Sequence, residues 1–403
     1  MTKINFKISF GYAFIHFAME VLCFFFLYRV FSGTGNWWTI ALVYDAVAFA
    51  GQVPVGAFCE KHPRFKPGVW GVLMLTLGAA IGLVAAESGA GTETVLSASG
   101  ATTGTNLTGL AAVIAVVGFV ILTVGNALLH ISGALVTLRV SEGRLSEPGI
   151  FVGGGAFGVI TGRLLGSGIG PVWIPFVLMA AAFILVVIID RAVRMVFTGS
   201  DNVGAVPFGP VADGTYDAGP DISEADISEH EKGFFCLHDI AADRPAEVVI
   251  LILAGVIMVR SYIGNGIPMQ WKKTAFAGVI LFVVMGVGKM AGGVLADLFG
   301  PRRIGVVSCI LAVPFLLLGN NLMWVSLIGI LLFSMTMAIA LGGIVSVIRN
   351  NPGIAFGITT LALFLGSLPI FFFPMPKGSI MNILLALLSV LSAAGIYFTV
   401  KDR

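Results

Sequence analysis

The sequence predicts an all-α membrane protein with twelve transmembrane helices arranged in two six-helix halves. Three observations predict this class: few charges, twelve long apolar stretches, and one long polar segment that divides those stretches six and six. Of the 403 residues, 57% are hydrophobic and only 11% are charged, whereas soluble globular proteins carry about 25% charged residues. So few charges cannot cover a water-soluble surface of this size, and the mean hydropathy of +0.99 agrees.

Each apolar stretch is long enough to cross a bilayer, which takes about 20 mostly apolar residues in a helix. The 52 glycines suit membrane helices, which use small residues where they pack closely. The predicted spans are 9–31, 37–59, 68–87, 109–138, 148–168, 172–193, 246–265, 274–297, 303–320, 324–347, 353–373 and 379–400.

Two connections are longer than the others. Residues 88–108 form a predicted loop rich in Gly, Ser and Thr, with no Lys or Arg. Residues 196–245 are polar and acidic (DISEADISEHEK) and are interpreted as a solvated linker, although the FFCLHDI run near their end is also compatible with a short interfacial helix. The predicted units are therefore an N-terminal half (1–195), a cytoplasmic linker (196–245) and a C-terminal half (246–403).

The positions of Lys and Arg predict the orientation, because cytoplasmic loops are enriched in both. With the N-terminus inside, the cytoplasmic segments hold sixteen of them and the outer segments only four: Arg29, Lys272, Lys273 and Lys377. The first apolar run is too long for a cleavable signal. We therefore expect a multi-pass protein of the bacterial inner (plasma) membrane, with both termini in the cytoplasm.

Charge, cysteines and motifs exclude several classes. A net charge of +2 does not favour nucleic acid as a partner. The four cysteines lie far apart, at Cys23, Cys59, Cys236 and Cys309, so we predict no disulfide, zinc site, other metal site or cofactor. The sequence holds no P-loop, G-x-S-x-G or HExxH motif, which argues against ATP-driven transport and against an enzyme.

An internal repeat relates the two halves. GAFCEKHPRFK, from Gly56, and GVLADLFGPRR, from Gly293, both place an acid four residues after the glycine and a basic turn beyond it. Likewise PGIFVG, from Pro148, matches PGIAFG, from Pro352. Duplicated halves with a site between them are the usual plan of secondary transporters.

The second copy resembles the loop signature of the major facilitator superfamily, which lies between helices 2 and 3 or 8 and 9. The matching residues are Gly293, Asp297, Gly300, Arg302 and Arg303. In the first copy Glu60 replaces the Asp and Pro63 replaces the second Gly. The resemblance implies a twelve-helix fold, a small-molecule substrate and transport by alternating access.

These motifs predict a cytoplasmic latch. Gly56 and Gly293 would let neighbouring helices approach, and the positive N-terminal ends of helices 5 and 11 would attract acids. We expect Glu60 to face the start of helix 5 and Asp297 the start of helix 11. Arg302 and Arg303 would hold the acid of their own copy. The alternative is that these charges only set the topology.

Helix 5 carries a ladder of glycines at spacing four, which predicts a close helix contact. Its members are Gly154, Gly158, Gly162 and Gly166. The resemblance offers a partial export signal here, since exporters of the superfamily carry a glycine motif with Gly-Pro in helix 5, and Gly170–Pro171 lies at the outer end of this ladder.

Ionisable residues inside a bilayer default to functional roles. Glu20 lies near the middle of helix 1, with His16 one turn before it on the same face. A midplane Glu beside a His is placed to exchange protons, which is what coupling to a proton gradient requires. The alternative is a Glu paired permanently with an Arg.

Helix 2 and helix 4 add further candidates. Asp45 is a candidate for coupling, or for a brace with Arg163 or Arg29, and Tyr44 beside it is a candidate substrate ligand. On helix 4 one polar stripe contains Thr123, Asn126, His130 and Gly133. Since the first and fourth helices of each half line the central cavity in the superfamily, the resemblance implies that His16, Glu20, Asn126 and His130 face the path. His130 is then a candidate for proton coupling rather than simple packing.

The positively charged residues in the predicted spans bear on the charge of the substrate. Arg163 and Arg260 are candidate substrate ligands, because Arg binds carboxylate and phosphate in a bidentate manner. If either has no acidic partner, an anionic substrate is expected; pairing with an acid is the alternative. Lys289, four residues before Gly293, is interpreted as structural or gating.

Together these patterns predict a proton-coupled secondary transporter, expected to be a monomer, for a small polar or anionic solute. HFAME in helix 1 and LHISGALVTLRVSEGR near helix 4 resemble fosmidomycin-resistance-type exporters, which favours export. An uptake permease, a transporter-like sensor and a lipid-handling protein remain as alternatives.

Overall fold

The computed structural model describes residues 3–88, 90–97, 100–107, 109–198, 240–266, 271, 274–319, 322–373 and 378–402. Within them, twelve helical spans are long and apolar enough to cross a membrane, which confirms the predicted number. Most of the predicted linker, including Lys232 and Cys236, lies outside the described residues. So do Lys272, Lys273 and Lys377.

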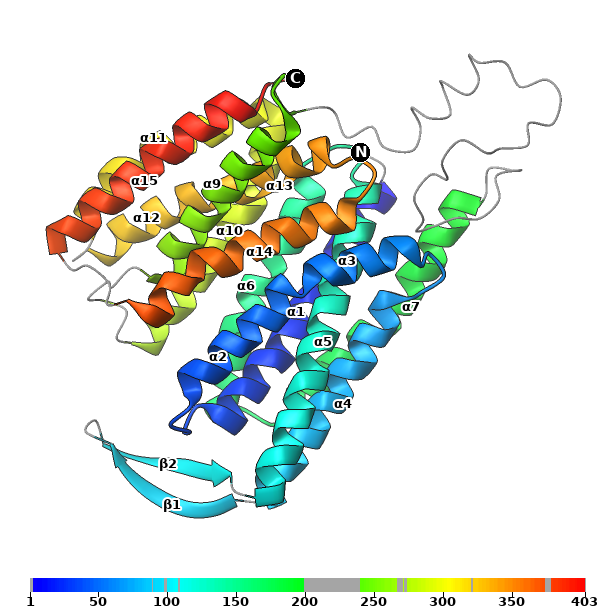
Figure 1. Ribbon diagram of the computed structural model, residues 1–403, viewed down its shortest axis with the longest axis vertical. Helices are drawn as coiled ribbons and strands as arrows, with labels where there is room; N and C mark the ends of the chain where they lie inside the picture. Colours follow the sequence, from blue (N-terminus) through cyan, green and yellow to red (C-terminus); the bar gives the residue numbers. More distant parts are fainter. Residues whose placement is uncertain are drawn as a thin grey trace.

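The helices run side by side as one bundle, with both chain ends at the same end of it (Figure 1). The first six spans comprise α1 (Lys3–Phe31), α2 (Trp37–Asp45), η1 (Ala46–Ala50), α3 (Gln52–Lys61), α4 (Pro67–Ser88), α5 (Gly109–Val140), α6 (Ser146–Gly166) and α7 (Ile174–Thr198). The last six comprise α9 (Ala246–Gly266), α10 (Ala275–Phe299), α11 (Pro301–Leu318), α12 (Met323–Ser334), α13 (Thr336–Val347), α14 (Pro352–Phe372) and α15 (Gly378–Thr399).

A β-hairpin replaces the loop expected at residues 88–108. Strand β1 (Ala90–Ser97) pairs antiparallel with β2 (Gly100–Leu107), in a register that runs from Ala90 opposite Leu107 to Ser97 opposite Gly100. Figure 1 shows the hairpin beyond the end of α4 and α5 that lies away from the chain termini. The Thr-rich sequence explains the difference, since β-branched residues favour strands.

Helix α6 is the element that holds the site in place, because it packs on α1 with one face and on α10 with another. A side chain at Gly154, Gly158, Gly162 or Gly166 would collide with a main-chain oxygen of α1. The predicted glycine ladder therefore does make a close helix contact. On the other face, Gly149 and Gly153 also lie against α10: a Cβ at Gly153 would collide with the Met290 side chain, and one at Gly149 would lie 3.1 Å from the Lys289 carbonyl oxygen.

The second span is interrupted by the π-turn η1 between α2 and α3. Such turns change how main-chain groups are bonded and are frequent at functional sites. Here Gln52 Nε2 donates to the carbonyl oxygen of Ala48 at 2.6 Å, and Thr360 Oγ1, from α14, donates to that of Phe49 at 3.0 Å. The hydrogen bond from Thr360 thus links the interrupted second span to the eleventh span.

Candidate functional site

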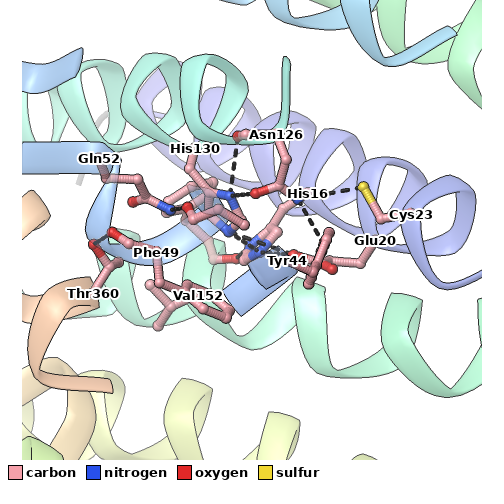
Figure 2. Close-up of polar contacts among 12 residues, drawn as sticks. His16, Glu20, Cys23, Tyr44, Phe49, Gln52, Asn126, His130, Val152 and Thr360 are labelled. Carbon is pink, nitrogen blue, oxygen red and sulfur yellow. Dashed lines mark hydrogen bonds and ion pairs between the residues drawn. The ribbon is translucent and has the colours of Figure 1, made fainter. Parts of the chain in front are cut away.

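Two histidines and a carboxylate meet inside the bundle. His16 and Glu20 come from adjacent turns of α1, and His130 comes from α5 (Figure 2). The two Nε2 atoms lie 3.0 Å apart. Glu20 Oε1 lies 3.5 Å from Nε2 of His130 and 3.7 Å from that of His16. All three side chains are buried, with exposed fractions of 3–7%.

Main-chain oxygens orient both rings. His16 Nδ1 lies 2.8 Å from the carbonyl oxygen of Phe151 on α6. The ring reaches it because residue 155 is glycine; any Cβ at Gly155 would collide with the imidazole. His130 Nδ1 lies 3.2 Å from the main-chain oxygen of Asn126 and 2.9 Å from its side-chain oxygen.

These partners assign the hydrogens on the rings. A main-chain carbonyl only accepts hydrogen bonds, so Nδ1 of both His16 and His130 carries the hydrogen. A neutral imidazole has one N–H, which leaves both Nε2 atoms as acceptors. Two bare nitrogens and the Glu20 carboxylate therefore face one another. Buried acceptors without a donor cost free energy, so a proton or another cation among them would stabilise the arrangement.

Asn126 extends the network toward helix 2. Its Nδ2 donates to Tyr44 Oη at 3.1 Å and lies 3.4 Å from Cys23 Sγ (Figure 2). Asn126 and Tyr44 also lie near the Glu20 carboxylate. Five predicted site residues are therefore brought together: His16, Glu20, Tyr44, Asn126 and His130.

Three predicted residues, Arg163, Asp45 and Arg260, make no direct contact with this cluster. Arg163 is exposed near the end of α6, where its guanidinium lies 5.1 Å from the centre of the Tyr28 ring. Asp45 follows Tyr44 in sequence, and its carboxylate makes no hydrogen bond or ion pair with a described residue. The expected brace between Asp45 and either Arg163 or Arg29 is therefore not observed.

The last six spans contain two cations, of which Lys289 interacts with the cluster and Arg260 with Lys289. Arg260, on α9, is 8% exposed, and its Nε has no hydrogen-bond partner among the described residues. Lys289, on α10, donates from Nζ to the carbonyl oxygen of Val152 at 3.3 Å. It lies within electrostatic range of both Arg260 and Glu20. In the described part of the chain, neither cation forms an ion pair with an acid.

The two acids of the repeated motif bind helix N-termini, but each binds the opposite one from that expected. Glu60 Oε1 accepts hydrogen bonds from the main-chain N–H of Gly353 at 2.6 Å and of Ile354 at 3.4 Å, at the start of α14. Asp297 accepts from the N–H of Leu145 at 2.9 Å and of Ser146 at 2.8 Å, at the start of α6.

The expected partners are thus exchanged between the halves. The motif glycines explain the pairing, since a side chain at Gly56 would collide with the main chain at Gly353, and one at Gly293 with that at Leu145. Each glycine brings its own helix against a helix from the other half. The acid one turn later then meets the exposed N–H groups there.

The basic residues of the second motif contact the C-terminal segment. The main-chain N–H groups of Arg302 and Arg303 donate to Asp402 Oδ1, at 2.9 and 3.2 Å, and Arg303 Nε lies 3.4 Å from Asp402 Oδ2. The Arg302 guanidinium lies 3.9 Å from the centre of the Tyr397 ring. The expected role of both arginines in holding Asp297 is therefore replaced by contacts to α15 and the residues after it. The turn itself requires its glycine, because Gly300 has a φ of 98°.

Four groups contribute to the site without having been assigned to it from the sequence. The carbonyls of Phe151 and Val152 are main-chain groups, for which no side-chain pattern gives a signal. Gly155 is not part of the ladder at spacing four. Its missing side chain leaves room for the His16 ring and not for the main chain of α1. Lys289 is expected from the sequence to be structural or gating, and its bond to the Val152 carbonyl joins α10 to α6 while leaving it within electrostatic range of Glu20.

Comparisons with known proteins identify the fold. No protein-family model matches the chain, and no curated protein matches it. Among solved structures it is similar to the major facilitator superfamily transporter FucP in the outward conformation, with 13% identity and a TM-score of 0.58 over 98% of this chain and 97% of that one. It is also similar to a bacterial homologue of the iron transporter ferroportin in an outward-facing state, with 14% identity and a TM-score of 0.53 over 98% and 96%. The chain therefore has the twelve-helix major facilitator fold.

Proposed function

We propose that the chain is a secondary transporter that works by alternating access and couples proton exchange at His16, Glu20 and His130 to the movement of a small anion. The convergence of the two bare Nε2 atoms on the Glu20 carboxylate carries the proposal. One proton shared among these three groups satisfies the acceptors and neutralises the carboxylate. Without it, the buried charge and lone pairs remain uncompensated.

The site suits exchange between two compartments. It lies in α1 and α5, which are the first and fourth spans, and these line the central path in the fold that the chain shares with known transporters. A proton that binds when the site faces one side and leaves when it faces the other links the conformational change to a proton gradient. Asp45, without a partner in the described chain, is a second carboxylate available to that path.

The cations supply the argument for an anionic solute. Arg260 and Lys289 are buried or half-buried, and neither has an acidic partner within 4 Å among the described residues. A buried cation without an anion is unfavourable. A carboxylate or phosphate group on the solute would compensate it, and Arg offers a bidentate geometry for that purpose.

Glu60 and Asp297 are the proposed parts of a cytoplasmic gate. Glu60 and Asp297 hold helices of opposite halves together at the end of the bundle where both chain termini lie. The distribution of Lys and Arg supports a cytoplasmic location for that end. We infer that the contacts form while the cytoplasmic side is closed and separate when it opens. Two of the solved structures that resemble this chain are outward-facing, and a closed cytoplasmic side here would agree with them.

The proposed direction of transport rests on the resemblance of two sequence stretches to exporters. The two stretches that resemble exporters carry His16, Glu20 and His130, so we favour export across a bacterial inner membrane. A cell assay separates the directions: an exporter lowers the accumulation of its solute relative to cells that lack it, whereas an uptake permease raises accumulation in a manner that an uncoupler abolishes.

Glu20→Gln tests the coupling role. A thermal-stability screen of the purified protein against small carboxylates and phosphates first selects a solute. In proteoliposomes with an imposed proton gradient, Glu20→Gln should abolish uphill transport of that solute and retain solute exchange. Glu87→Gln, at an exposed position on α4, serves as the control and should transport normally.

Uphill transport by Glu20→Gln at the wild-type rate would overturn the assignment. Two other outcomes point to the alternative functions. Binding without movement in proteoliposomes indicates a sensor, and stabilisation by lipids in place of the polar anions indicates a lipid-handling protein.

A further inference from the structure

We propose that the His16–Glu20–His130 site is a binding site for a divalent first-row transition-metal ion, of which Zn²⁺, Fe²⁺ and Co²⁺ are examples. The binding itself is independent of the proposed function. Only the consequence for transport, that the metal ion and the coupling proton compete for these three groups, rests on it.

The distances among the three groups fit one ion. The sides of 3.0, 3.5 and 3.7 Å between the two Nε2 atoms and Glu20 Oε1 define a triangle whose three corners lie about 2.0 Å from a common central point. Zinc binds His nitrogen at about 2.0–2.1 Å and carboxylate oxygen at about 2.0–2.2 Å. The ligand atoms therefore already stand at coordination distance from one point, without any movement of helix α1 or α5.

The donor set favours a transition metal over other cations. Two imidazoles and one carboxylate form the set found in non-haem iron sites and in catalytic zinc sites. Ca²⁺ and Mg²⁺ prefer shells made of oxygen ligands and are disfavoured by two imidazole nitrogens. Na⁺, a hard cation as well, shares that preference for oxygen.

The outer contacts are those of metal-bound histidines. Such a histidine donates its second N–H to a carbonyl or carboxylate, which fixes the tautomer and the direction of the ring. His16 does this with the Phe151 carbonyl at 2.8 Å, and His130 with the oxygens of Asn126. Both contacts leave Nε2 without a hydrogen and at coordination distance from the central point, as coordination requires.

The charge balance connects this site with the cations nearby. One carboxylate and two neutral imidazoles carry a charge of about −1, so a bound divalent ion makes the cluster positive. Lys289 adds to that charge within electrostatic range of Glu20, and Arg260 lies within range of Lys289. An anion bound beside the metal would compensate it, so metal and anion should favour each other's binding.

Metal binding by the purified full-length protein tests the inference. After treatment with a chelator, Co²⁺ is titrated into the protein and followed by its ligand-field absorption, and Zn²⁺ is measured by equilibrium dialysis. We expect about one ion per chain at this site. Glu20→Gln and His130→Gln should each weaken binding by more than about tenfold. His62→Gln provides a matched control, because His62 is exposed just beyond the end of α3 and its loss should leave binding unchanged.

The test uses two variants, Glu20→Gln and His130→Gln, which change different ligands. If one of them does not fold and fails to elute as a monodisperse peak, the metal affinity of the other still tests the site. Absence of stoichiometric binding, or affinity unchanged in a folded variant, overturns the inference. If the wild type binds no metal yet Glu20→Gln still abolishes uphill transport in chelator-treated buffer, the metal site fails and the proton-coupled function stands. If the wild type binds metal and Glu20→Gln loses it while transporting uphill normally, the metal site stands and the proton-coupled function fails.

Discussion

Glu60, in the last turn of α3, accepts a hydrogen bond from the main-chain N–H of Gly353 at the first turn of α14, with a distance of 2.6 Å. The contact joins the second span to the eleventh. Asp297 and Ser146 form the equivalent contact between the eighth span and the fifth, at 2.8 Å. The two contacts are related by the internal repeat, so each half supplies one acid and one helix start.

Removing the Glu60 carboxylate should open this end of the bundle. Hydrogen bonds to a charged group contribute about 1.5–3 kcal/mol each, so Glu60→Ala should raise the population of the open form at least several-fold. Cys59, next to it in sequence and 2% exposed, is a natural reporter. We expect its labelling by a maleimide, resolved by peptide mass spectrometry, to become several-fold faster.

Two controls accompany the labelling measurement. Cys309, buried in α11, should keep its rate. Glu142→Ala removes an acid whose observed hydrogen bond is with Asn5 rather than with a helix start, and should leave Cys59 protected. Equal Cys59 rates in Glu60→Ala and the wild type would contradict the latch.

The packing of α6 on α1 should not tolerate one methyl group. At Gly158 an added Cβ would collide with the Phe17 carbonyl oxygen and lie 2.7 Å from Glu20 Cβ. Overpacking of this kind costs about 1–3 kcal/mol, so Gly158→Ala should lower the Tm in detergent. At Gly255, on α9, the same change meets nothing within 4 Å. Gly255→Ala should therefore keep or slightly raise the Tm, since alanine favours a helix more than glycine does. Equal Tm values for the two variants would argue against the ladder.

Arg260 should be dispensable for stability and required for the anion. Because it has no acidic partner among the described residues, Arg260→Met removes a buried charge without leaving an acid uncompensated. We expect the Tm to stay level or rise, while the apparent affinity for the anionic solute in the stabilisation assay falls by at least about tenfold. Arg260→Lys, which keeps the charge but loses the bidentate geometry, should bind with an intermediate affinity. A lower Tm with unchanged solute affinity would mean that Arg260 is structural.

The number of spans and the glycine ladder could be predicted because each depends on local patterns: apolar length gives the spans, and spacing of four gives one helix face. That His16 and Glu20 share a face also follows from their spacing of four, whereas the expectation that His130 joins them rests on the resemblance to the superfamily. The partner of Glu60 could not be predicted, because the sequence contains two equivalent PGI helix starts. Only the tertiary arrangement decides which start lies against Gly56.

Other features escaped prediction for different physical reasons. The π-turn at Ala46–Ala50 is stabilised by contacts from outside its own segment, including the one from Thr360. The metal-like geometry of the site depends on ring orientation, which main-chain oxygens of Phe151 and Asn126 determine. The cysteine and histidine spacings in the sequence therefore carry no sign of a metal site, because its ligands come from two helices far apart in the chain.

The carbonyl oxygens of Phe151 and Val152 belong to consecutive residues of α6. The first receives His16 and the second receives Lys289, so one short stretch of main chain is held from both sides, by the first span and by the eighth. A small rotation of α6 about its axis would alter both contacts at once. The two adjacent peptide groups therefore couple the histidine site to Lys289. A change in what is bound between the two histidines should alter the Lys289 contact as well.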